Sequence, residues 1–191
     1  MAEIWKGAPA AQAITEGLAD RAARLRERGV VPTLAIVRVG ERPEDLAYER
    51  GALKRCEKVG VTLRVFALPA DASQEALLEV IHEINGDSGI HGCLLFRPLP
   101  RHMDEEAVRR ALSPAKDVDG ITDGSLAGVF AGSAQGFPPC TAQACLELLR
   151  HYGCDPAGKR AVVVGRSLVI GRPVALLLLQ ANPTDSVCHT K

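Results

Sequence analysis

The chain has 191 residues, with 23 basic and 23 acidic side chains and a formal net charge of zero. This balance gives no electrostatic reason to expect nucleic acid or an anionic membrane as a partner. No apolar run reaches the roughly 20 residues that a membrane span needs. Because the N-terminus also lacks the apolar core of a signal peptide, we expect a cytoplasmic protein.

The first half of the chain alternates helical and strand patterns. Apolar spacing, β-branched runs and Gly or Pro boundaries predict helices over 8–28, 43–60, 73–84 and 104–112, and strands over 32–40, 61–68 and 91–97. Such an alternation predicts a parallel sheet with crossover helices.

The second half begins with residues 120–139, whose Gly, Ser and Pro content without a sustained period predicts a linker. The patterns that follow predict helices over 141–152 and 174–181, and strands over 161–164 and 185–188. We therefore expect an α/β protein of two lobes: a substrate domain over 1–120, a linker over 121–140, and a Rossmann-like nucleotide-binding domain over 141–191. A nucleotide-binding sheet normally has about six strands, so the second lobe is expected to be incomplete. The sequence leaves open whether the chain is a fragment or a missing segment comes from elsewhere.

The six cysteines are scattered, without a C-x-x-C pair or His at zinc-ligand spacing. We expect no metal site and interpret the cysteines as reduced thiols in or near the core. They are Cys56, Cys93, Cys140, Cys145, Cys154 and Cys188.

The stretch AVVVGRSLVIGRP, residues 161–173, predicts a strand buried on both faces, a glycine turn and a helix. In that geometry, free N–H groups and the helix dipole point at one spot, where a dinucleotide pyrophosphate usually binds. The alternative is an ordinary βα turn, in which Gly165 and Gly171 only let the helix pack closely on the strand.

Three other stretches are candidates for ligand contact. In PAKDVDG, an extended chain would point Asp117 and Asp119 to one side, where they suit a polar ring bearing an amino group; the alternative is a solvated turn. Tyr48 suits stacking on an aromatic ligand, or is an ordinary core or rim residue. Pro98 and Pro100 end a strand at the carboxyl edge of the sheet, either at a ligand site or as a simple exit.

Together these stretches resemble the bifunctional methylenetetrahydrofolate dehydrogenase/cyclohydrolase family. The matching pieces are PTLAIVRVG with the Pro and Tyr that follow, CEKVG, HG-x-L with PLP, PAKDVDGIT, PPCT, VVVGRS with IGRP, and CHTK. The resemblance implies a folate between two α/β lobes, NADP on the second lobe and a homodimer. The family's later P-G-G-V-G segment has no counterpart in these 191 residues.

The resemblance also implies roles for individual residues. Tyr48 would stack on the folate, with Asp117 and Asp119 near the pterin, and Pro98, Leu99 and Pro100 would complete the substrate site. The residues implied for cofactor binding are Gly165, Arg166, Ser167, Ile170, Gly171, His189 and Thr190.

Two departures from the family concern its cyclohydrolase step. The family's catalytic lysine, four residues after the tyrosine, is Ala52 here, and its supporting glutamine is Phe96. Lys54 is rotated about 200° from Ala52 around the helix and is a poor substitute. Smaller departures are Asp45, where the family has a serine, and Ala142 and Ala144, where it has a proline and a glycine.

We therefore expect NADP-dependent oxidation of 5,10-methylenetetrahydrofolate to 5,10-methenyltetrahydrofolate, with cyclohydrolase activity lost or weak. NADP is expected over NAD because the last strand ends without an acidic residue for the ribose 2′-hydroxyl, while Arg166 and Thr190 suit a 2′-phosphate. The alternative is that Arg166 is solvated and the cofactor is NAD. The alternative is a truncated, catalytically inactive protein that still binds folate or nucleotide.

Overall fold

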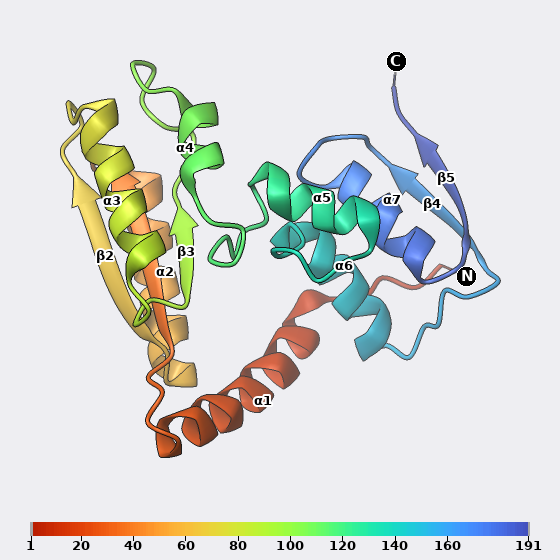
Figure 1. Ribbon diagram of the computed structural model, residues 1–191. Coiled ribbons are helices and arrows are strands. Elements are labelled where there is room, and N and C mark those ends of the chain that lie inside the picture. Colours follow the sequence, from red (N-terminus) through yellow and green to blue (C-terminus); the bar gives the residue numbers. More distant parts are fainter. Residues whose placement is uncertain (1, 191) are drawn as a thin grey trace. The chain divides into compact units, whose positions relative to one another are not determined.

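The computed structural model describes residues 2–190, and the chain divides into two compact units (Figure 1). The first unit is Ala13–Asp117, and the second joins the residues before it to those after it. Helix α1 (Gly7–Glu27) begins in the second unit and continues into the first. No helix among the described residues is both long and apolar enough to cross a bilayer.

The first unit is a three-stranded parallel sheet with helices between its strands. After α1, its elements are β1 (Thr33–Val39), α2 (Pro43–Val59), β2 (Thr62–Leu68), α3 (Gln74–Gly86), β3 (Gly92–Leu95) and α4 (Glu105–Ala111). The strand order is β2-β1-β3, with Thr33 opposite Thr62 and Leu34 opposite Gly92. All strands are parallel, as the alternation of patterns predicted.

Local sequence explains where these elements begin and end. Helix α3 follows Ser73, whose hydroxyl accepts from the Ala76 N–H at 3.2 Å. Helix α2 starts at Pro43 and ends at Gly60, whose φ of +74° closes the helix in the left-handed conformation. Strand β1 is buried along almost all of its length because it lies at the centre of the sheet.

The second unit contains α5 (Asp123–Ala131), α6 (Cys140–His151), β4 (Arg160–Val164), α7 (Gly171–Gln180) and β5 (Thr184–Cys188). Strands β4 and β5 form a parallel pair (Figure 1). Helices α6 and α7 pack together through a small core of Ala142, Leu146, Val174 and Leu178, against which Ala161 and Val163 of β4 are packed.

Strand β4 is not buried on both faces, so that prediction was wrong. Ala161 and Val163 are half-buried, but Val162 is 63% and Val164 82% exposed. Alternate residues of a strand point to opposite faces, and only the face that bears Ala161 and Val163 packs on the helical core. An apolar run shows that a strand prefers burial, but not how many faces are covered.

Residues 120–139 are not irregular throughout, which corrects the expected linker. They contain α5, which starts after Thr122 and ends at Gly132 with φ +64°. The Thr122 hydroxyl accepts from the Ser125 N–H at 3.1 Å. The segment following α5 passes so close that a Cβ at Gly128 would overlap the Gln135 carbonyl. Close packing around small residues thus stabilises a helix that lacks an amphipathic period.

All six cysteines are free thiols, but their expected location near the core holds only in part. Cys56 and Cys93 are buried, and Cys145 and Cys154 are half-buried. Cys140 and Cys188 are exposed, which corrects the prediction for these two residues. Both lie at element ends, Cys140 at the start of α6 and Cys188 at the last position of β5.

Candidate functional site

A cavity in the first unit lies at the carboxyl ends of the strands. It is lined by Val39, Gly40, Glu41, Arg42, Ala70, Pro98, Leu99 and Pro100. The Gly40 N–H donates to the Leu68 carbonyl at 2.9 Å, and its φ of +79° allows the turn after β1. The structure thus brings three predicted substrate residues to the sheet edge where α/β proteins bind ligands.

Glu105, the first residue of α4, holds the segment that leaves β3. One carboxylate oxygen accepts from Arg97 Nη1 at 3.2 Å, and the other accepts from the Leu99 N–H at 3.3 Å. The segment is therefore tied to α4 at two points on either side of Pro98. Sequence reasoning missed Glu105, although an acidic residue in a first helical turn after RPLP was a usable signal.

Tyr48 lies on α2 with 62% of its surface exposed. Its ring meets the buried ring of Phe96 edge-on, with centroids 5.4 Å apart and planes at 78°. Ala52, one turn further along the helix, is half-buried, and Lys54 is exposed. Arg55 Nη1 donates to Thr15 Oγ1 of α1 at 3.1 Å. The aromatic pair therefore includes Phe96, the residue at the position where the family resemblance puts the supporting glutamine of the cyclohydrolase step.

Asp117 lies in a bridge to β3 and Asp119 in the turn that follows it, so the two residues do not share one continuous extended segment. Asp117 is fully buried and forms an isolated parallel bridge with Cys93, whereas Asp119 is half-buried. Burial, reinforced by the charge of Asp117, raises the pKa of the Cys93 thiol to about 12. The boundary between the two units falls between the two aspartates.

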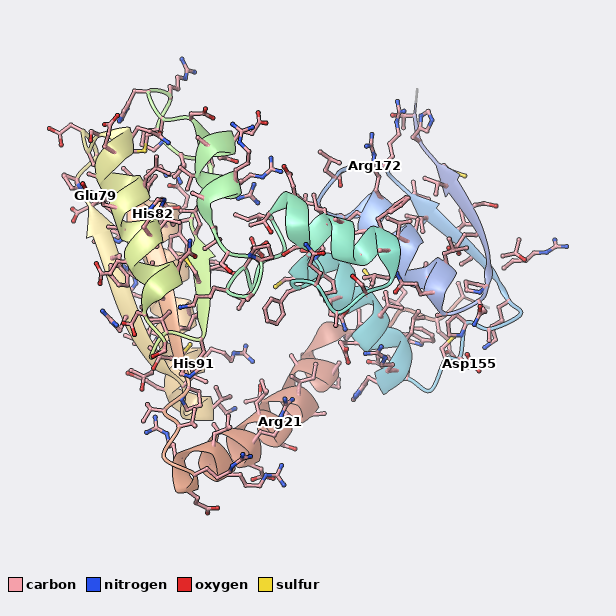
Figure 2. The ribbon with its side chains drawn as sticks, in the orientation of Figure 1. Arg21, Glu79, His82, His91, Asp155 and Arg172 are labelled. Atoms are coloured by element: carbon pink, nitrogen blue, oxygen red, sulfur yellow. The ribbon has the colours of Figure 1, made fainter. Side chains whose placement is uncertain are left out.

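In the second unit, the turn from β4 to α7 requires glycine at two positions. Gly165 has φ +123°, which other residues rarely adopt, and open space lies where its Cβ would be. A Cβ at Gly171 would overlap the Gly165 carbonyl and lie 2.7 Å from the Arg166 nitrogen. Arg172, labelled in Figure 2, donates through Nε to the Arg166 carbonyl at 3.2 Å. The turn is therefore closed by direct backbone contact.

The side chain of Ser167 accepts hydrogen bonds from backbone N–H groups at the start of α7. Its hydroxyl oxygen accepts from the N–H groups of Ile170 at 3.1 Å and Gly171 at 3.3 Å. We expected free N–H groups for an anion at this helix start. For Ile170 and Gly171 that expectation was wrong, because both N–H groups donate to Ser167. A serine at a helix start commonly accepts from exposed backbone donors in this way.

A second cavity lies beside this turn. Its lining consists of Val164, Gly165, Arg166, His189 and Thr190. Residues from the ends of β4 and β5 meet here because the strands are parallel and the Gly165 N–H donates to the Cys188 carbonyl at 2.8 Å. Four of the seven predicted cofactor residues therefore share one cavity, while Ser167, Ile170 and Gly171 form the adjoining turn and helix start.

Sequence reasoning missed an ion pair in the first unit. Arg38 of β1 donates through Nε to Glu49 Oε2 of α2 at 2.8 Å, and their side chains are only 10% and 21% exposed. The available signal was a charged residue inside an otherwise apolar strand, since such residues are buried only when paired. Among residues 2–190, no group of three or more His, Cys, Asp or Glu side chains could hold a metal ion.

Comparison with known protein families gives two matches in order along the chain. Residues 5–119 match the catalytic domain of tetrahydrofolate dehydrogenase/cyclohydrolase, and residues 139–191 match the NAD(P)-binding domain of the same enzymes.

Individual relatives agree with these matches. The chain is 50% identical over 191 residues to the bifunctional protein FolD of Carboxydothermus hydrogenoformans and 46% identical to that of Alkaliphilus oremlandii, covering all of this chain and 67% of each relative. The crystal structure of FolD from Campylobacter jejuni superposes with a TM-score of 0.90 at 36% identity, covering 96% of this chain and 65% of that one. The Trypanosoma brucei enzyme, solved with NADP and an inhibitor, gives 0.86 at 33% identity, covering 98% and 64%. The chain thus spans about two thirds of the length of these relatives.

Proposed function

Since the chain belongs to the tetrahydrofolate dehydrogenase/cyclohydrolase family, we propose that it oxidises 5,10-methylenetetrahydrofolate to 5,10-methenyltetrahydrofolate with NADP as the hydride acceptor. The observation that carries this proposal is the ordered match of both family domains to one chain. A hydride leaves the methylene carbon with its electron pair, and the N5 lone pair of the folate compensates the charge that develops. The protein's contribution is chiefly alignment of the two reactants.

On the substrate side, Tyr48 is the proposed stacking residue for the folate. Its exposed ring and its edge-on contact with Phe96 support this role, because the contact leaves ring surface available while limiting its orientation. Pro98, Leu99 and Pro100 line the adjoining cavity. Asp117 and Asp119 are proposed to act near the pterin, with the half-buried Asp119 the more accessible of the two.

On the cofactor side, the β4–α7 turn fits a dinucleotide. Open space at Gly165 lets a phosphate approach the backbone, and the cavity gathers Arg166, His189 and Thr190 beside it. When bound, NADP supplies the hydride-accepting nicotinamide. The chain's residues hold it: Gly165 and Gly171 shape the turn, Ser167 and Ile170 order the helix start, and Arg166 binds the 2′-phosphate with Thr190 donating to it.

We further propose that cyclohydrolase activity is absent or very weak. Adding water to the methenyl carbon requires proton transfers that a positioned side chain accelerates. Ala52 and Phe96 offer no such group, and Arg55 is held on Thr15. A separate hydrolase would then be needed to consume the methenyl product in one-carbon metabolism. We also expect a cytoplasmic protein that forms a homodimer. Sedimentation analysis of the purified protein tests the dimer.

The proposal is tested by incubating the purified chain with 5,10-methylenetetrahydrofolate and either NADP or NAD, and recording the absorbance of the methenyl product. Product formed faster with NADP supports the proposal. The alternative is a binding-only protein that holds folate or nucleotide without turnover. Calorimetric binding of tetrahydrofolate or NADP without product would favour that alternative.

A further inference from the structure

We propose that the Arg38–Glu49 ion pair is a positioning device for the folate site, coupling Tyr48 to the cavity at the strand ends. The inference rests on the proposed function and concerns only the first unit. Arg38 donates to Glu49 Oε2 at 2.8 Å through Nε and to the Gly40 carbonyl at 2.6 Å through Nη1. One guanidinium therefore joins the first half of α2 to the turn after β1.

The two segments that Arg38 joins are those that carry the proposed ligand contacts. Glu49 is the residue next to Tyr48 on α2, and Gly40 lines the cavity together with Pro98 and Leu99. A shift of either segment would break a hydrogen bond to the same side chain. Arginine suits this role because its planar fork holds two acceptors in fixed directions, whereas lysine is a flexible point charge.

A second contact lies beside this pair. The Phe96 N–H donates to the Val37 carbonyl at 2.9 Å, so Phe96 continues alongside β1 at the level of Arg38, one residue beyond the pairing of Val37 with Leu95. Phe96 meets Tyr48 edge-on. Two neighbouring contacts, one ionic and one aromatic, thus attach a single turn of α2 to the carboxyl ends of β1 and β3.

Burial makes the ionic contact sensitive to change. Arg38 as a whole is 8% exposed, and removing one partner of a buried pair leaves the other charge uncompensated. The exposed pair Arg110–Glu106 on α4, with side chains 56% and 64% exposed, provides a matched control. Exposed ion pairs contribute little to stability, and both members of this pair lie on the same helix, so it joins α4 to no other element.

The experiment measures binding of tetrahydrofolate by calorimetry under anaerobic conditions, for the parent chain and for Arg38→Met, Arg38→Lys, Glu49→Gln and Arg110→Met. We expect Arg38→Met to weaken tetrahydrofolate binding at least tenfold, the two conservative variants to weaken it less, and Arg110→Met to change nothing. NADP binding should be unchanged in all four. Circular dichroism checks that each variant folds. If Arg38→Met does not fold, the tetrahydrofolate affinities of Arg38→Lys and Glu49→Gln relative to the parent chain decide the question.

A double-mutant cycle separates positioning from a general loss of structure. If Arg38 acts through Tyr48, Tyr48→Ala should weaken tetrahydrofolate binding much less in the Arg38→Met background than in the parent. Unchanged tetrahydrofolate binding in Arg38→Met, additive effects with Tyr48→Ala, or an equal loss of NADP binding would each overturn the positioning role. A parent chain that binds no tetrahydrofolate would instead overturn the proposed function, and this inference with it.

Discussion

Gly171 packs directly on the backbone of Gly165: a Cβ at position 171 would overlap the Gly165 carbonyl. We predict that Gly171→Ala opens the β4–α7 turn, weakens NADP binding at least tenfold and lowers the free energy of unfolding by about 1–3 kcal/mol, the usual cost of overpacking. Calorimetry and urea unfolding measure the two effects. Gly17→Ala is the control, because nothing lies within 4 Å of its Cβ position on α1; it should bind NADP normally and be slightly more stable. Tolerance of Gly171→Ala in both assays would contradict the prediction.

Arg166 lies in the second-unit cavity with His189 and Thr190. We predict that Arg166→Ala weakens NADP binding by ten- to a hundredfold and NAD binding by less than threefold, because only NADP carries the 2′-phosphate that a guanidinium binds bidentately. Calorimetric titration of both cofactors measures this. Arg172→Ala serves as the control, since its Nε is engaged with the Arg166 carbonyl; it should not discriminate between the cofactors. Equal weakening of NADP and NAD by Arg166→Ala would disprove the phosphate role.

The sequence predicted the alternation of elements well because each strand and each capped helix carries a local pattern. Ser73 and Gly60, for example, mark a helix start and a helix end by chemistry that acts within one turn. Helix α5 was not predicted, because small residues stand where an apolar helical period would be expected. Thr122 and Gly132 nevertheless cap it by the same rules. Its stability depends on contacts with residues such as Gln135, which no local pattern shows.

The candidate sites were predictable where they follow from strand ends. Parallel pairing of β4 with β5 brings Gly165 and Thr190 to the same cavity, as expected. A charged residue in the apolar strand β1 indicated that Arg38 needs a partner, but not that the partner is Glu49, because the sequence gives no distance between a strand residue and a helix residue. The hydrogen bonds of Ser167 were missed for a different reason: the hydroxyl suits either a phosphate or its own helix, and only the geometry decides.

Asp185 of β5 has a carboxylate that is inaccessible to solvent and has no hydrogen-bond partner among the described residues. Burial raises its pKa above the usual carboxyl value of about 4. The folded state therefore binds the proton more tightly than the unfolded state. It follows that the destabilisation due to Asp185 is absent below about pH 4 and grows as the pH rises through the folded-state pKa.

We predict that Asp185→Asn raises the free energy of unfolding at pH 7.5 by about 1–2 kcal/mol, because the neutral amide avoids burying an unpaired charge. The gain should disappear near pH 4, where Asp185 is protonated. Urea unfolding at several pH values measures both. Asp20→Asn on the exposed surface of α1 is the matched control and should show no such dependence. A stability difference that is the same at pH 4 and pH 7.5 would show that the charge of Asp185 is not the cause.

The contact between Tyr48 and Phe96 fills the place where the family resemblance puts a hydrogen-bonding glutamine. We predict that the parent chain accumulates methenyl product without hydrolysing it above the uncatalysed rate. Ala52→Lys with Phe96→Gln should introduce hydrolysis, since a positioned acid/base group contributes typically 10²–10⁴-fold. Decay of methenyl absorbance, with the substrate supplied directly, measures this step independently of NADP.

Glu49 limits how much activity the double variant gains. It lies three residues before Ala52 on α2, a spacing at which helical side chains meet, so its carboxylate would attract the new ammonium and raise the pKa of that group. Arg38, the present partner of Glu49, would compete for the same carboxylate. We therefore expect Ala52→Lys/Phe96→Gln to hydrolyse slowly at neutral pH and faster toward alkaline pH, as the ammonium loses its proton. Adding Glu49→Gln should move that rise to lower pH, at some cost in folate affinity. Rapid hydrolysis by the parent chain, or a pH profile that Glu49→Gln leaves unchanged, would contradict this account.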